Sequence, residues 1–236
     1  MAPGRPVTTD QVLAWIQANA DEDHREGLLR YNIPNERAVG IAIGDLKRYA
    51  KEVGRSHALA LELWETGGYE ARTLAAFLDE PSAVTPGQMD EWAAEFDSWA
   101  ICDTVCSHLF DRTPFAWAKM KGWAPREEEF VRRGAYALLW GLAVHDKDSP
   151  DAPFVEGLKL IARAESDPRP LVKKAVNMAL RGVGKRNWRL NAAAIEVAHQ
   201  LAAEDAKDRS WIGRHAVREL TSEKVQKRFS QSDPSR

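Results

Sequence analysis

Helical periodicity along almost the whole chain is the sequence feature that most limits the fold. Apolar side chains recur at intervals of three and four residues, as at Leu138, Leu139 and Leu142, and again at Ile195 and Ala198. This spacing places them on one face of an α-helix. We therefore predict an all-α protein.

One short segment departs from this pattern. Val39, Ile41 and Ile43 alternate with other residues, as side chains on one face of a strand do. The segment is brief and flanked by glycines. We interpret it as an extended approach to a helix that starts near Asp45.

Local start and stop signals divide the chain into many short helices. Ser56 is a suitable N-cap, and Thr85-Pro86 and Thr113-Pro114 each pair an N-cap with a proline at the first helical position. Gly67-Gly68 ends one helix. The predicted helices lie near residues 8–20, 23–31, 45–53, 57–66, 69–79, 87–96, 99–110, 114–122, 126–145, 153–165, 170–184, 188–204 and 208–219.

The order of these helices is typical of a repeat protein. Helix pairs recur roughly every 35–45 residues, which is the spacing of a HEAT-type α-solenoid. A compact helical bundle would give a similar pattern. We predict a curved α-solenoid of HEAT-like antiparallel helix pairs, which would offer a groove for an elongated partner. It forms a single domain over residues 1–229, and residues 230–236 form a disordered tail.

Composition narrows the class of protein. The chain is 44% hydrophobic and 29% charged, as expected for an ordinary globular protein. Its longest uncharged, mostly apolar run, residues 134–144, is too short to cross a membrane, and the N-terminus lacks the pattern of a secretory signal. The two cysteines are too few for a disulfide scaffold. We expect a cytoplasmic monomer.

The charges are unevenly distributed along the chain. Residues 1–120 contain 11 basic and 19 acidic residues, whereas residues 121–236 contain 22 basic and 16 acidic residues. A net charge of −2 therefore does not exclude a polyanionic partner. Uneven surfaces are also common in proteins that bind no nucleic acid.

Trp99 and Asp103 form the first candidate site. They are four residues apart, so a helix places them on one face. An aromatic ring beside a carboxylate suits a cationic ligand. The alternative is that Trp99 belongs to the core and Asp103 is a surface or capping residue. Cys102 and Cys106 lie close to this face, and their C-x3-C spacing without a second pair indicates core residues rather than a zinc site.

Basic residues form the second candidate site. Lys174, Met178, Arg181 and Lys185 recur at helical spacing as one stripe with no acidic partner at that spacing. Such a stripe can bind phosphates or can be a solvated helix face. The residues that broaden the site are Lys173 and Arg186, together with Arg132 and Arg133 ahead of an apolar helix. An arginine of that pair could reach a phosphate, pair with Asp103 or simply be solvated.

Signatures of other chemistries are missing. The chain has no H-E-x-x-H, no G-x-x-x-x-G-K-[ST] phosphate loop and no G-x-S-x-G sequence. Its six histidines are scattered. We expect neither a metal nor a cofactor.

Together these segments resemble the AlkD-like, HEAT-repeat DNA alkylation repair glycosylase family. The resemblance extends from Arg30 to about Phe229. Its carriers are Gly40–Lys47, Leu63–Arg72, the Trp99 and Asp103 pair, Arg132-Arg133, Lys173–Arg181 and Gly184–Asn187.

The resemblance implies a solenoid that holds duplex DNA in its concave face and removes cationic N3- and N7-alkylated purines without flipping the base. By position, Asp103 matches the catalytic carboxylate and Trp99 the aromatic residue that contacts the deoxyribose of the lesion. Arg133 matches an arginine near the DNA backbone. Met178 stands where better-known members carry a tryptophan against the lesion, and Ala100 replaces an acidic residue found in some relatives.

Three functions follow from these features. The first is a monofunctional glycosylase acting on double-stranded DNA that contains alkylated bases. The second is an inactive HEAT-repeat module that binds distorted or branched DNA, which the methionine at position 178 favours. The third is a helical scaffold for a protein partner, which the basic stripe argues against.

Overall fold

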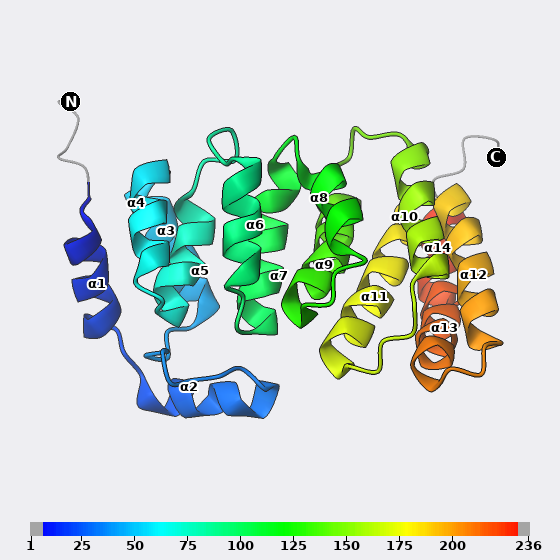
Figure 1. Cartoon of the computed structure of the whole chain (residues 1–236), viewed down its shortest axis with the longest axis horizontal. Helices are drawn as coiled ribbons and strands as arrows, with labels where there is room; N and C mark the ends of the chain where they lie inside the picture. The colour runs from blue at the N-terminus through cyan, green and yellow to red at the C-terminus, as the bar shows by residue number, and fades with distance from the viewer. Residues whose placement is uncertain (1–6, 231–236) are drawn as a thin grey trace. The chain divides into compact units, whose positions relative to one another are not determined.

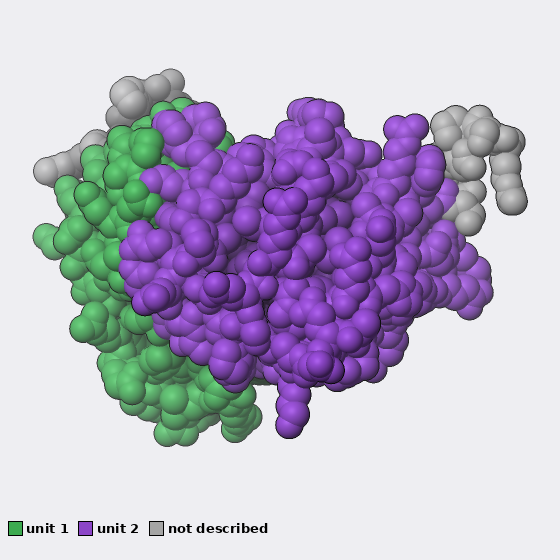
Figure 2. Space-filling model, turned by 45° about the vertical axis from the view of Figure 1, so that its right-hand side comes forward, with its two compact units in different colours: residues 1–113 green, residues 114–236 purple. Residues whose placement is uncertain are grey.

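The structure, a computed structural model, describes residues 7–230 and is all-α over that range, as predicted (Figure 1). No helix in this range is both long and apolar enough to cross a membrane. The chain divides into two compact units, residues 1–113 and residues 114–236, which Figure 2 shows in different colours. Each unit has its own core.

Unit 1 is organised around α5. Its elements are α1 (Thr9–Ala18), α2 (Glu22–Gly27), the 3-10 helix η1 (Leu28–Tyr31), α3 (Ile43–Val53), α4 (His57–Glu65), α5 (Tyr69–Leu78), α6 (Pro86–Ala94), α7 (Trp99–His108) and the 3-10 helix η2 (Phe110–Arg112). Helix α5 contacts α3, α4 and α7. Trp64 of α4 stacks on Trp92 of α6 with ring centroids 4.0 Å apart, and the Arg72 guanidinium lies 4.6 Å from the Trp64 ring. Aromatic packing of this kind supplies much of the buried apolar area.

A buried carboxylate fixes the loop before α3. Glu70 is 1% exposed, and its Oε1 accepts hydrogen bonds from the amides of Gly40 at 2.8 Å and Val39 at 3.1 Å, with Ile41 at 3.3 Å. Gly40 has φ +91°, and a Cβ there would lie 2.0 Å from the Asp21 carbonyl oxygen. As predicted, this segment leads into a helix and forms no strand, although Gly40 is left-handed rather than extended; α3 begins at Ile43, two residues before the predicted start.

Unit 2 is organised around two helix contacts, α9 with α11 and α12 with α13. Its elements are α8 (Ala116–Trp123), α9 (Glu129–His145), α10 (Asp151–Arg163), α11 (Pro170–Val183), α12 (Trp188–Ala202), α13 (Lys207–Leu220) and α14 (Glu223–Ser230). Gly213 allows α12 and α13 to approach closely, because a Cβ there would lie 2.2 Å from the Ala202 amide nitrogen. Asn177 of α11 is buried and donates to the Ile212 carbonyl at 3.0 Å, which joins α11 to α13.

Two of the predicted helix starts are confirmed. Ser56 Oγ accepts from the Leu59 amide at 3.3 Å, and Thr85 Oγ1 accepts from the Gln88 amide at 3.1 Å with Pro86 at the first helical position. The start predicted at Thr113 is wrong, because its hydroxyl donates to the Phe110 carbonyl at 2.8 Å and closes the η2 turn. Helix α8 begins two residues after Pro114 instead.

The other differences lie at helix ends. The helix predicted over 23–31 is divided into α2 and η1, and the helix predicted over 99–110 ends at His108. Helix α14 was not predicted, because Val225 is its one buried apolar residue. The predicted tail began at residue 230, which ends α14, and residues 231–236 lie outside the described part of the chain.

Candidate functional site

Helix α7 in unit 1 carries the first pair of candidate residues. Its N-cap, Ser98, accepts from the Ile101 amide through Oγ at 3.3 Å. Trp99 is therefore the first helical residue, and Asp103 follows one turn later on the same side. Both side chains are half-buried, whereas Ile101, between them in sequence, is buried. The helix thus keeps this pair partly accessible.

The indole of Trp99 is held by the N-terminal segment. Its Nε1 donates to the Tyr31 carbonyl at 2.8 Å, and the ring packs against a small cluster that includes Leu28 and Ile33. The sequence left open whether Trp99 is a core residue or contacts a ligand. In the structure part of its ring is packed and part remains exposed. The ring can therefore contact a ligand without a large loss of side-chain entropy.

Asp103 places negative charge beside buried thiols. Burial raises the pKa of the Cys106 thiol well above its ordinary value, helped by a hydrogen bond with Cys102 and by the charges of Asp103 and Asp111. Both cysteines are buried and free. Their interpretation as core residues is confirmed.

The two arginines at the start of α9 lie in unit 2 and have different environments. Arg132 Nη1 pairs with Asp167 Oδ2 at 2.9 Å, and its Nε donates to the Arg126 carbonyl at 2.6 Å. Arg133 is 4% exposed and donates Nη1 to the Leu171 carbonyl at 2.5 Å. The position of Arg133 in the family pattern led us to expect it near the DNA backbone. Its burial instead makes it a link between α9 and α11 here.

Arg186 is also engaged within unit 2. Its guanidinium lies 4.0 Å from the Phe154 ring and donates to the carbonyls of Ala143 and Ser149, each at 3.2 Å, and of Asp146. These bonds hold the connection between α9 and α10. We had predicted a basic surface residue here, and the structure gives this arginine a structural role.

The remaining basic candidates lie on α11 and in the turn that follows it. Lys174 is exposed, and Lys173, Met178, Arg181 and Lys185 are half-buried. Helix α11 ends at Val183, so the last lysine of the stripe lies beyond the helix. Lys173 Nζ lies 4.7 Å from the centroid of the Trp211 ring on α13.

An acidic residue from the neighbouring helix pairs with part of this stripe. Glu219 of α13 forms an ion pair with Arg181 and another, at 2.7 Å, with Lys185. Burial raises the pKa of the Glu219 carboxyl, but the hydrogen bonds and charges of these two cations outweigh it and leave the pKa lowered. The expectation of a stripe without acidic partners holds along α11 itself and is wrong once α13 is included.

Helix α13 adds basic and aromatic residues that the sequence analysis missed. Burial lowers the pKa of His215 most, and the charges of Arg218, Arg181, Arg214 and Lys173 lower it further. The His215 ring lies 4.2 Å from that of Trp211. Spacing alone could have indicated these residues, because positions 211, 214, 215 and 218 share one face of a helix. We call this surface, formed by Lys173, Lys174, Arg181, Lys185, Trp211, Arg214, His215 and Arg218, the α11–α13 basic surface.

Metal ligands are not grouped in the described chain. No set of three or more His, Cys, Asp or Glu side chains among residues 7–230 could hold a metal ion. Basic side chains alternating with aromatic rings are instead the arrangement used to bind nucleic acid backbones and bases.

Comparison with known proteins decides the family. The model of the DNA alkylation repair enzyme family matches residues 12–220. The chain belongs to this family. No curated protein was found to match it.

A solved structure supports the fold of this DNA alkylation repair enzyme family member. It is described as "a new family of proteins related to the HEAT-like repeat DNA glycosylases with affinity for branched DNA structures", with 20% sequence identity and a TM-score of 0.75. The match covers 91% of this chain and 96% of that chain. The HEAT-like helical fold is therefore confirmed.

Met178 is one of the two positions at which the sequence analysis found a departure from the AlkD-like pattern. Met178 is half-buried on α11, between Lys174 and Arg181. A thioether is apolar and polarizable but has no aromatic face to offer a cation. Among the site residues predicted from the sequence, Trp99 is the aromatic one.

Proposed function

We propose that this chain is a monofunctional DNA glycosylase that releases cationic N3- and N7-alkylated purines from double-stranded DNA. The observation that carries the proposal is the Trp99 and Asp103 pair, which α7 keeps half-buried on one side, with the indole held by the Tyr31 carbonyl. Membership of the DNA alkylation repair enzyme family supports it.

The chemistry requires one carboxylate. In a cationic alkylpurine, the bond between C1′ and the purine nitrogen breaks with its electron pair moving to the base, which leaves as a neutral molecule. The deoxyribose becomes oxocarbenium-like, and the Asp103 carboxylate stabilises this charge and orients a water molecule. The water oxygen bonds to C1′ and its proton passes to the carboxylate or to solvent, leaving an abasic site. No general acid is needed, and the Trp99 ring adds cation–π stabilisation.

The α11–α13 basic surface is proposed to hold the DNA backbone. Lys174 is exposed and forms no ion pair with a described residue, and Arg214 is likewise exposed without one. These two side chains can neutralise phosphates without first breaking an ion pair within the protein. We include Lys173, Arg181 and Lys185 in this role, the last two in competition with Glu219.

A second function is favoured by Met178 and by the description of the solved relative. An inactive module that binds branched or distorted DNA needs the basic surface but no catalytic carboxylate. That relative is described as belonging to proteins with affinity for branched DNA.

Release of free base separates the two functions. Duplex DNA containing 7-methylguanine is incubated with the wild-type protein and with Asp103→Asn, and released base is measured by chromatography. The glycosylase proposal expects release by the wild type, a loss of at least about a hundredfold in the variant, and equal affinity for DNA. Equal release by both proteins refutes the role of Asp103. Salt-sensitive binding without release from 7-methylguanine or 3-methyladenine duplexes supports the binding module instead.

A further inference from the structure

Unit 2 contains a pocket separate from the α7 pair. Its volume is about 360 Å³, within the range of roughly 300–1,000 Å³ found for sites of small organic ligands. The walls come from the end of α8, the start of α9, the end of α10 and the first turns of α11 and α13. Its apolar lining includes Ala124, Leu160, Val172, Val176 and Ile212.

Four of the eight charged side chains in the pocket wall already form hydrogen bonds or ion pairs within the fold. Asp167 is held by Arg132 at 2.9 Å and by Arg169 at 2.6 Å. Asp208 accepts from Ser166 Oγ at 2.6 Å and from the Asp167 amide at 2.8 Å. These contacts form a structural network in which two arginines neutralise Asp167, whereas Asp208 is bonded to neutral donors and keeps its charge.

Arg209 completes this network. Its guanidinium pairs with Glu204 and donates to the carbonyls of Ala162 and Ala164, each at 2.7 Å. It thereby satisfies the C-terminal end of α10. Its charge is thus used within the fold.

Three cations in the lining are not paired in this way. The side chains of Lys121, Arg163 and Lys173 form no hydrogen bond or ion pair with any residue in the described range, and Lys173 instead lies over the Trp211 ring. The Glu156 carboxyl has its pKa lowered mainly by a hydrogen bond from Lys159, with smaller contributions from Lys121 and Arg163. Glu165 is the one lining carboxylate without a partner among residues 7–230. Over the whole lining, five cations and three carboxylates leave an unpaired charge of +2.

A tyrosine hydroxyl completes the site. Tyr136 is 2% exposed, lines the pocket and has no hydrogen-bond partner for its hydroxyl within residues 7–230. Burial raises the pKa of Tyr136 to about 12, so the hydroxyl keeps its proton at neutral pH and can donate it to a ligand. Because Tyr136 lines the pocket, a ligand bound there can accept this hydrogen bond.

The first turn of α11 adds to this preference for an anion. Val172 and Lys173 belong to that turn, and no side chain caps it. Pro170 has no amide proton and the Lys173 amide bonds to the Arg169 carbonyl at 3.1 Å, so the unpaired amides of this turn, which carry partial positive charge, are those of Leu171 and Val172. Cations, a phenolic donor and a helix start thus converge on an apolar pocket.

We propose that this pocket binds a phosphate monoester carried on a nucleoside, with the phosphate at Lys121, Arg163 and Lys173 and the nucleoside against the apolar wall beside Tyr136. A dianionic phosphate matches the unpaired charge, and its oxygens accept from all of these donors. The ligand has two possible sources, a free mononucleotide or the 5′-phosphorylated end of a DNA strand. This function goes beyond glycosylase activity and does not depend on it.

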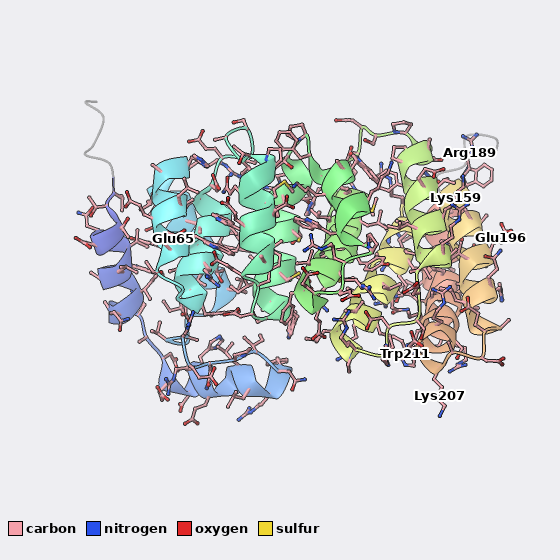
Figure 3. All side chains as sticks on the ribbon, in the orientation of Figure 1. Glu65, Lys159, Arg189, Glu196, Lys207 and Trp211 are labelled. Carbon is pink, nitrogen blue, oxygen red and sulfur yellow. The ribbon has the colours of Figure 1, made fainter. Side chains whose placement is uncertain are left out.

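The test uses the full chain and two probes. Deoxyadenosine 5′-monophosphate is titrated by calorimetry, and a single-stranded oligonucleotide with a 5′-phosphate is compared with the same strand bearing a 5′-hydroxyl. Tyr136→Phe removes only the hydroxyl, and Arg163→Ala removes an exposed cation. Arg189→Ala is the matched control, because Arg189 is exposed at the start of α12, away from the end of α13 that carries Trp211 (Figure 3).

The proposal expects binding that weakens about fivefold in Tyr136→Phe and about five- to tenfold in Arg163→Ala, and that is unchanged in Arg189→Ala. Binding of the mononucleotide identifies the free ligand. A preference for the 5′-phosphorylated strand, without competition by the mononucleotide, identifies the strand end. The proposal is overturned if neither probe binds up to about 5 mM, or if Arg189→Ala weakens binding as much as Arg163→Ala.

Discussion

Glu219 controls how much positive charge the α11–α13 basic surface can offer to DNA. Its carboxylate pairs with both Arg181 and Lys185, so two cations share one anion. Glu219→Gln keeps the shape of the side chain and removes its charge. We expect the variant to bind duplex DNA more tightly than the wild type.

The size of this effect follows from the number of cations released. Each additional phosphate neutralised steepens the dependence of log affinity on log salt by about 0.9, so one or two freed cations steepen it by about 1–2. At low salt this corresponds to an affinity roughly threefold to tenfold higher. Arg181 and Glu219 are both about one-third exposed, so the loss of the pair should lower the free energy of unfolding by less than about 1 kcal/mol.

Fluorescence anisotropy with a labelled duplex over a range of salt concentrations measures both quantities. Glu196→Gln is the control, because Glu196 is an exposed residue of α12 that forms no ion pair with a described residue (Figure 3). The control should change affinity by less than twofold. An unchanged salt slope in Glu219→Gln, or a decrease in affinity, would refute the reasoning and show that Glu219 positions the two cations rather than masking them.

Three further predictions concern the fold. Glu70→Gln should lower the free energy of unfolding in urea by about 2–3 kcal/mol, because amides of the loop before α3 lose a charged acceptor, whereas Glu65→Gln, at an exposed site, should have little effect. Hydrogen bonding by Arg169, reinforced by Arg132 and opposed by burial, lowers the pKa of the Asp167 carboxyl below its ordinary 3.8. The contribution of Asp167 to the free energy of unfolding is therefore complete above about pH 4 and is lost as the pH falls through the pKa of the folded state. In acid unfolding, Asp167→Asn should make the free energy of unfolding less dependent on pH in this window. Gly213→Ala should cost about 2–3 kcal/mol or more in thermal unfolding because its Cβ meets the backbone of α12, whereas Gly122→Ala, with no neighbour within 4 Å, should be neutral or stabilising.

Local signals in the sequence predicted most of the helices. Ser56 and Thr85 act as N-caps because a cap depends on amides only three residues away. Thr113 has the same local sequence but bonds backward to Phe110, so its role depends on the preceding 3-10 turn. Helix α14 was missed because it has only two apolar residues, Val225 and Phe229, and a single pair one turn apart is too short a pattern to indicate a helix.

The candidate site was predicted less completely, because charge pairing depends on helices distant in sequence. Spacing identified Arg181 as basic and accessible along α11, and no pattern in that segment indicates Glu219, which lies 38 residues later. Arg133 and Arg186 are of the residue type that binds phosphates, and the sequence alone therefore indicated a phosphate-binding surface. In the structure their guanidinium groups donate to main-chain carbonyls instead. Arg214 and Arg218 could have been found by applying the same spacing argument to α13.

The burial of Cys102 and Cys106 affects how readily alkylating agents can modify the protein itself. These are the only two cysteines in the chain, and both lie in the core of unit 1. The thiolate is the form that reacts with electrophiles, and the raised pKa of Cys106 keeps that thiol protonated. Reagents that methylate purines in DNA would therefore find no reactive thiol on the folded protein. On the proposed function, the enzyme would resist the same chemical attack that creates its substrate.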